Sequence, residues 1–176
     1  MCKFYSAVVT KNGDLYHNPF LTSHEDIIDL FNLHNADNKP FIDKLCRIEF
    51  YPDDDKYICD VDKYNLHVDE DIVPEWFEEY RELTISKLRD IINSMIIKED
   101  SELIVGRGII LSNDITVRKL SNCVVYHCNN SRIENACNSR IVYAGSSTIK
   151  HADSSRIVNA DNSTIVNAGN STIINK

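Results

Sequence analysis

The carboxy-terminal part of the chain repeats one pattern of apolar and polar positions every eight residues. When residues 107–176 are written in rows of eight, the third position of every row is a β-branched apolar residue. In the eight complete rows the sixth position is small except at Leu120, and the eighth is always Asn, Asp or Ser. A pattern that keeps its phase over nine rows indicates a repeat architecture. The third positions are Ile109, Val117, Val125, Ile133, Ile141, Ile149, Ile157, Ile165 and Ile173.

Each row predicts a short strand followed by a turn. In the row that begins at Ser163, Ser163 and Ile165 would face one side of the strand, and Thr164 and Val166 the other. The Asn, Asp and Gly residues that follow tolerate the backbone conformations of tight turns. Stacked strand-turn rows form a β-solenoid. We therefore predict that the third positions from Ile109 to Ile165 are its buried core, each contributing about 1.5–3 kcal/mol.

The fourth position of each row indicates that two rows make one coil. With two rows per coil, this outward position is apolar on one face and mostly charged on the other, whereas three rows per coil would mix the two classes. We therefore predict coils of 16 residues, about four in number, rising ~20 Å at the usual strand spacing. The apolar face carries Ile110, Tyr126, Val142, Val158 and Ile174, and the other carries Arg118, Glu134, Lys150 and Val166.

The amino-terminal part predicts mixed helices and strands rather than a repeat. Phe4–Val9 and Leu15–His17 flank an Asn-Gly turn and predict a hairpin. The segment Ser23-His24-Glu25-Asp26 resembles a capping box and predicts a helix through about Leu33.

Two further strands and a long helix complete this part. Leu45–Tyr51 and Tyr57–Val68 predict strands around a polar turn. Pro74 would begin a helix that extends to about Lys98. We expect an α+β domain over residues 1–100 and an all-β solenoid over residues 101–176. The broad apolar face of the long helix consists of Trp76, Phe77, Tyr80, Leu83, Leu88, Ile91, Ile92 and Met95.

The two parts of the chain differ in the sign of their net charge. The net charge of −8 divides into 11 basic against 23 acidic residues over 1–106, a balance of −12, and 8 against 4 over 107–176, a balance of +4. An acidic surface disfavours direct binding of nucleic acid, and the basic part has only a short arginine ladder of Arg140 and Arg156. The chain contains no apolar run long enough to span a bilayer, and its first residues lack the apolar core of a signal peptide.

Residue types that commonly carry chemistry show no recognised spacing. The carboxylates Asp53, Asp54, Asp55, Asp60 and Asp62, with His67 nearby, lack the Gly and Glu positions of a calcium loop. The six cysteines have no C-x-x-C pair, which disfavours zinc and predicts reduced thiols. No histidine lies in a catalytic motif, so we expect surface or turn histidines. We predict no metal, no cofactor and no enzyme activity.

The repeat Ser-Thr-Ile-Val-Asn-Ala-Gly-Asn resembles the octapeptide of bacterial ice-nucleation proteins, whose rows also pair into 16-residue coils. The resemblance implies the solenoid fold. An ice-binding face needs an outward Thr-x-Thr grid, but here Thr164 is followed by Val166 and Thr148 by Lys150. Arg132, Arg140 and Arg156 interrupt the Thr ladder as well, so ice binding is not expected.

The amino-terminal segments FYSAVVTKNGDLYHNPF, SHEDIIDLFNL, RIEFYP and HVDEDIVPEWF resemble an uncharacterised family of gut bacteria and their phages. Its members join a domain of this kind to octapeptide repeats. The resemblance implies a cytoplasmic protein of a bacterium or of a phage that infects one. No catalytic or binding residues are assigned in that family, so none can be transferred to this chain.

Two functions are consistent with these observations. In the first, the chain is a non-catalytic assembly module that forms a homodimer through the carboxy-terminal coils, because Ile173 and the stripe Ile110, Tyr126, Val142, Val158 and Ile174 would otherwise face water. A long helix folded over the stripe is the other way to cover it. In the second, the chain is an inhibitor or decoy whose acidic domain binds a basic surface of a host protein.

Overall fold

The computed structural model describes residues 4–34 and 44–174, and the chain divides into two compact units. Unit 1 extends from Met1 to Asn93 and unit 2 from Ser94 to Lys176. An α/β region with an antiparallel sheet is followed by a parallel β-solenoid, as the sequence predicts.

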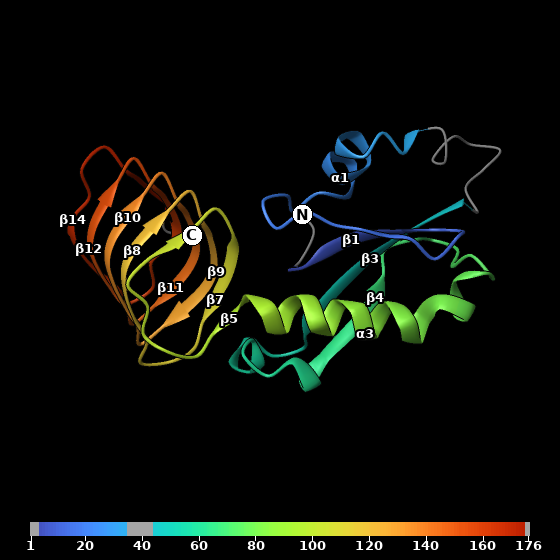
Figure 1. The fold of residues 1–176 in the computed structure, drawn as a ribbon, viewed down its shortest axis with the longest axis horizontal. Coiled ribbons are helices and arrows are strands. Elements are labelled where there is room, and N and C mark those ends of the chain that lie inside the picture. The colour runs from blue at the N-terminus through green and yellow to red at the C-terminus, as the bar shows by residue number, and fades with distance from the viewer. Residues whose placement is uncertain (1–3, 35–43, 175–176) are drawn as a thin grey trace. The chain divides into compact units, whose positions relative to one another are not determined.

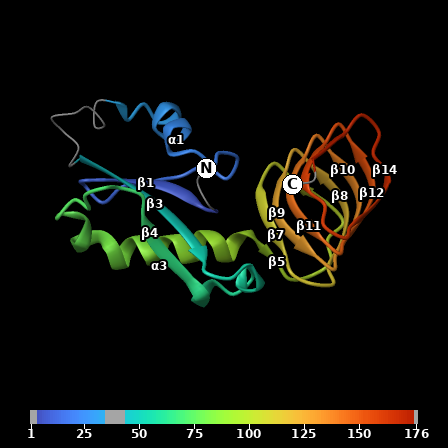
Figure 2. The same ribbon diagram turned by 180° about the vertical axis from the view of Figure 1, so that it is seen from behind.

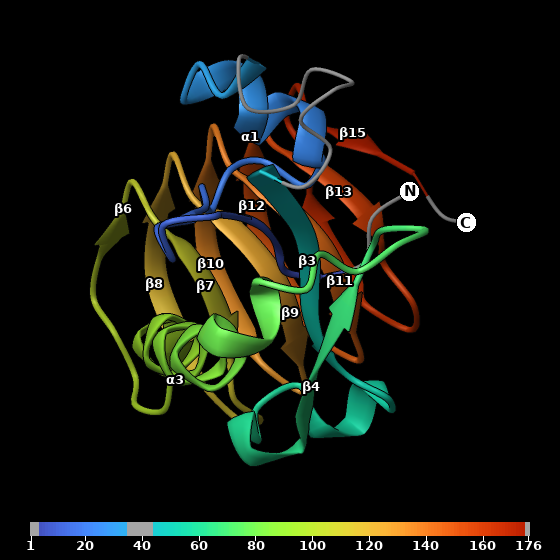
Figure 3. The same ribbon diagram turned by 90° about the vertical axis from the view of Figure 1, so that its right-hand side faces the viewer.

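Unit 1 is built on a four-stranded antiparallel sheet of order β2-β1-β3-β4. The strands are β1 (Ser6–Thr10), β2 (Leu15–Tyr16), β3 (Leu45–Pro52) and β4 (Tyr64–Val68). The predicted hairpin is present: Val9 pairs with Leu15, and Gly13 takes φ 78° in the turn. Figures 1 and 3 show α1 (His24–Leu30) and α3 (Phe77–Met95) on opposite faces of this sheet.

The helix α1 is shorter than predicted. Ser23 caps it, with its Oγ accepting a hydrogen bond from the Asp26 N–H at 3.4 Å. The helix ends at Leu30 rather than near Leu33, because Asn32 adopts a left-handed φ of 53° and the Leu33 N–H turns back to the Ile28 carbonyl at 2.9 Å.

The predicted strand Tyr57–Val68 is wrong in its first half. Residues 55–63 form two 3₁₀ turns, η2 (Asp55–Tyr57) and η3 (Val61–Lys63), and the strand begins only at Tyr64. The Asp54 carboxylate accepts a hydrogen bond from the Lys56 N–H at 3.0 Å. This local bond favours a turn over an extended chain.

The long helix α3 buries one side of its surface. Phe77, Thr84, Leu88, Ile92 and Met95 are buried at helical spacing. Leu83, predicted on the same face, is 51 % exposed, so the apolar stripe is narrower than the sequence indicates.

Unit 2 is a two-sided parallel solenoid whose rows repeat every 16 residues. Ile133 pairs with Val117 on one side and with Ile149 on the other, and Ile141 pairs with Val125 and Ile157. Figure 2 shows the stacked coils from behind. The five-stranded sheet has the order β14-β12-β10-β8-β6 and the six-stranded sheet the order β15-β13-β11-β9-β7-β5. The strands are β5 (Ile96–Ile97), β6 (Ile104–Val105), β7 (Gly108–Leu111), β8 (Thr116–Ser121), β9 (Val124–Asn129), β10 (Arg132–Cys137), β11 (Arg140–Gly145), β12 (Thr148–Asp153), β13 (Arg156–Asn159), β14 (Thr164–Asn167) and β15 (Thr172–Ile173).

The solenoid has about five turns rather than the predicted four. It begins at β5, where Ile96 pairs with Ile110, and continues through β6, where Ile104 pairs with Leu120. The row before residue 107 has Ser101 at its third position, yet Ser101 still forms a parallel bridge with Val117. The apolar signal is lost in this row although the backbone pairing continues.

The core of unit 2 lies between its two sheets. The third-position residues Ile109, Val117, Val125, Ile133, Ile141, Ile149 and Ile157 are all 0 % exposed. Ile165 packs against this cluster and is only half-buried.

Left-handed residues close the turns between strands. The eighth position of each row from Asp114 to Asn162 has a φ between 47° and 63°. Asn, Asp and Ser reach this conformation more readily than bulky side chains, because their short polar groups bond to the local backbone.

Candidate functional site

The predicted apolar stripe is only partly accessible. Ile110 is 0 % and Tyr126 7 % exposed, whereas Val142, Val158 and Ile174 are half-buried. Burial raises the pKa of Tyr126 to about 12, so its hydroxyl stays neutral. The part of the stripe that a partner could contact therefore lies on β11, β13 and the residue after β15.

The last coil in the described part of the chain presents exposed apolar side chains, as the first coil does at Leu103 and Val105. The strands β14 and β15 are the terminal strands of their sheets in the described part of the chain, and Figure 1 shows β14 at one end of the stack. The outward Val166 is 64 % exposed. At the inward third position Ile173 is 41 % exposed and Ile165 is half-buried, while Ile149 and Ile157, one coil earlier, are 0 % exposed. The third-position ladder is thus partly exposed at this coil in the described part of the chain.

The outer face of the five-stranded sheet carries paired charges. Arg118 lies 3.3 Å from the Glu102 carboxylate, and Arg132 Nε donates to Glu134 Oε1 at 3.0 Å. The hydrogen bond from Arg132 lowers the pKa of Glu134, and Lys150 and Arg118 add to the effect. Each arginine on this face therefore has an acidic partner.

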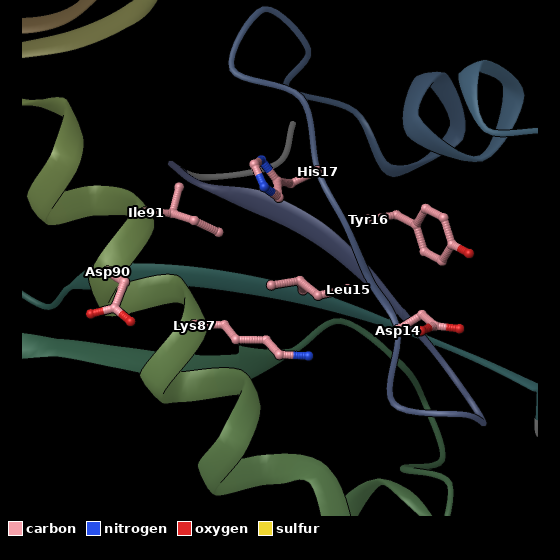
Figure 4. A pocket seen from close by; sticks show the side chains of 7 residues that line it. All are labelled: Asp14, Leu15, Tyr16, His17, Lys87, Asp90 and Ile91. Carbon is pink, nitrogen blue, oxygen red and sulfur yellow. The ribbon is translucent and has the colours of Figure 1, made fainter.

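A cavity of about 590 Å³ lies in unit 1 between β2 and α3. Figure 4 shows Lys87 reaching from α3 toward the strand, while the Tyr16 ring points away from the helix. The Lys87 ammonium donates to the Gly13 carbonyl at 3.4 Å. The lining residues are Asp14, Leu15, Tyr16, His17, Lys87, Asp90 and Ile91.

His17 is the residue of this cavity whose pKa is shifted by burial. Its Nδ1 lies 2.6 Å from the Tyr5 hydroxyl, and its burial lowers the pKa of the imidazole. A neutral ring either accepts the Tyr5 O–H at Nδ1 or donates from Nδ1 to the hydroxyl oxygen, depending on its tautomer. The cavity combines one ammonium, two carboxylates and a neutral imidazole, which suits a small polar molecule. The sequence contains no signal for this cavity, because its two walls are some 70 residues apart and neither contains a motif.

Two carboxylates of the predicted acidic cluster, Asp53 and Asp54, bind side chains close to them in the structure. Asp54 is 2.7 Å from the Lys56 ammonium, and Asp53 accepts from the Asn65 amide at 2.8 Å. Asp53, Asp54 and Asp55 also line an open cavity of about 620 Å³. Within residues 4–34 and 44–174, no three His, Cys, Asp or Glu side chains are grouped as metal ligands.

The expectation of surface histidines is wrong for His24. This side chain is 1 % exposed, with Nε2 donating to the Ile48 carbonyl at 2.9 Å and Nδ1 3.3 Å from Asp69 Oδ2. It connects α1 to β3 and to the residue after β4. The sequence contains no periodic signal for such a contact, since its partners are 24 and 45 positions away.

No disulfide links the described cysteines. Cys46, Cys123 and Cys128 are buried, and burial raises the pKa of Cys46 and of Cys128 to about 12. Thiols of this kind stay protonated and act as small apolar side chains.

Comparison with known proteins finds no family model, no curated protein and no solved structure that matches this chain. None of the described helices combines the length and the apolarity needed to cross a lipid bilayer. The function must therefore be argued from the surfaces themselves.

Proposed function

We propose that this chain is a non-catalytic assembly module that binds a second copy of itself through the coil formed by β14 and β15. The observation that carries the proposal is the solvent exposure of Val166 and Ile173 on the terminal strands of both sheets. Terminal strands with apolar side chains are the surfaces on which β-structures pair with another chain.

Burial of apolar surface supplies the driving force. Ile165 and Ile173 occupy the repeat position that is fully buried in the preceding coils, so covering them completes the ladder. A fully buried Ile or Val side chain contributes about 1.5–3 kcal/mol relative to an exposed one. Several such side chains per copy are enough to favour association.

A two-fold arrangement accommodates these edges. Homodimers most often have this symmetry, and it would pair the terminal strands of the two copies antiparallel. Val142, Val158 and Ile174 lie along the same sheet and would extend the contact. The interface predicted from the sequence is retained here without Ile110 and Tyr126, which are buried within this chain's structure.

The test is the mass of the purified chain, measured by light scattering at several concentrations. We expect the parent to be a dimer and the variant Val166→Lys with Ile174→Lys to be a monomer, because charged edge residues oppose strand pairing. Lys150 occupies the equivalent outward position one coil before Val166, so lysine is compatible with the folded repeat.

The matched control is Leu103→Lys with Val105→Lys, which adds the same charge at two exposed apolar positions of the first coil and should leave the dimer intact. A monomeric parent would contradict the proposal. That result would favour the alternative, in which the acidic unit 1 binds a basic partner with an affinity that falls as salt concentration rises.

A further inference from the structure

Two arginines lie side by side on the outer face of the six-stranded sheet. Arg140 on β11 pairs in register with Arg156 on β13. Adjacent strands are about 4.8 Å apart, so the two side chains leave the sheet as direct neighbours. Like charges placed opposite each other on neighbouring strands are destabilising.

On the five-stranded sheet, the arginine at the same repeat position has an acidic partner. Arg132 occupies the same repeat position on β10, but its in-register neighbours are Thr116 and Thr148. The next outward residue on its own strand is Glu134, whose carboxylate it binds at 3.0 Å. Arginine at this position is therefore neutralised where the fourth position is acidic.

That compensation is missing on the six-stranded sheet. The outward residues that follow Arg140 and Arg156 are Val142 and Val158, which are apolar. Neither arginine forms an ion pair with a carboxylate in residues 4–34 and 44–174, and Arg140 Nε is buried with no hydrogen-bond partner there. The pair thus holds two positive charges beside a low-dielectric surface.

We propose that Arg140 and Arg156 together bind one phosphate group, as the free dianion or as the monoester of a small molecule. Two guanidinium groups match its two negative charges and offer paired N–H donors to its oxygens. Thr172 follows Arg156 in register on β15 and places a hydroxyl beside the pair.

The extent of the charge favours a single phosphate over a nucleic-acid backbone. Along this column of the sheet, the neighbour of Arg140 on the other side is Val124, and that of Arg156 is Thr172. The column of positive charge is therefore two residues long. A polynucleotide would need a longer series of basic contacts.

The experiment measures the melting temperature of the full chain as inorganic phosphate is added, with ionic strength held constant by sodium chloride. A ligand that binds only the folded state raises the melting temperature. We expect a phosphate-dependent rise for the parent and for Arg132→Gln, and the loss of that rise in Arg140→Gln with Arg156→Gln. Broadening of the phosphorus resonance of phosphate by the parent, but not by the double variant, gives a direct measure of binding.

A second readout uses the same double variant without phosphate. Removal of the like-charge contact should leave it at least as stable as the parent, so a lost phosphate response cannot be explained by unfolding. No phosphate-dependent rise in the parent, or an equal rise in the double variant, would overturn the proposal. Because Arg140 and Arg156 lie two residues from Val142 and Val158 on the same strands, light scattering on the same double variant distinguishes a lost phosphate site from a lost dimer.

Discussion

At the scale of single residues, short polar side chains decide where the solenoid turns. Asn122, Asn130 and Asn138 have left-handed φ values of 53°, 49° and 47°, and Ser146 has 47° at the same repeat position. In the last described turn the left-handed residue is Gly169, one position earlier, with φ 50°. The repeat predicts which position takes the left-handed conformation in most turns. In the last described turn that position is set by the place of a glycine.

His17 allows a prediction of pH dependence in unit 1. Its pKa is lowered by burial from the ordinary value of 6.5. The unfolded chain therefore binds a proton more readily than the folded one, so stability is present above pH 6.5 and declines as pH falls from there toward the folded-state pKa. Urea unfolding followed by the fluorescence of Trp76, on either side of this range, should show the loss.

The variant His17→Gln should lose less stability than the parent over the same pH interval, because its amide does not titrate. Asp14, Lys87 and Asp90 line the same cavity and remain in both proteins, so their contribution cancels in the comparison. His151→Gln, in unit 2, is the control and should behave like the parent. An identical pH profile for His17→Gln and the parent would show that His17 is not the group responsible.

At the scale of the elements, a column of buried serines connects successive coils. Ser147 Oγ accepts the Ser131 N–H at 3.1 Å and donates to the Gly145 carbonyl at 3.0 Å. Ser139 and Ser155 repeat the contact at 3.2 Å on the other sheet. These hydroxyls satisfy backbone N–H groups that the strand ladders leave unpaired inside the core.

The variant Ser147→Ala should therefore lower the free energy of unfolding by more than a substitution of similar size at an outward strand position does. The Ser131 N–H would remain buried without an acceptor, a loss of about 1–3 kcal/mol. The measurement is the free energy of unfolding of unit 2 from urea denaturation. Thr148→Ala, at the outward neighbouring position, should change it by about 0.5 kcal/mol or less, and equal effects at both positions would contradict this role of the serine column.

At the scale of the whole molecule, each of the two compact units contains a core cluster. The core cluster of unit 1 contains Val8, Ile27, Ile28 and Leu45, and the cluster of unit 2 runs along the solenoid from Ile104 to Ile157. The single tryptophan, Trp76, lies in unit 1. Loss of one core can therefore be distinguished from loss of the other.

Ile149→Asp should unfold unit 2. Ile149 is 0 % exposed and is paired in register with Ile133 and Ile165, so the carboxylate would be buried without a partner. Such a substitution belongs to the class that costs more than about 4 kcal/mol. Circular dichroism should lose the β-structure of the repeats, while Trp76 fluorescence keeps its folded signal. A variant that melts like the parent would refute the core assignment, and Lys150→Gln is the neutral outward control.

The solenoid could be read from the sequence because its signal is local and repeated. Each row of a coil needs an inward β-branched residue, a small residue and a turn residue, and the eight complete rows meet this requirement with Leu120 as the one exception at the small position. The pairing of Ile133 with Ile149 follows from the period alone, and so does the pairing of Arg140 with Arg156. Where the pattern lapses, at Ser101, the structure continues toward the amino terminus, so the predicted coils began one coil too late.

Tertiary structure decided the features that depend on a single distant contact. The burial of His24 against Ile48 and the cavity between Asp14 and Asp90 each arise once, between segments far apart in the chain. Periodicity cannot indicate contacts that do not recur. The sequence by itself therefore determined the repeat, its inward face and its turns, whereas three-dimensional packing alone determined which polar groups are enclosed and which apolar positions remain open to a partner.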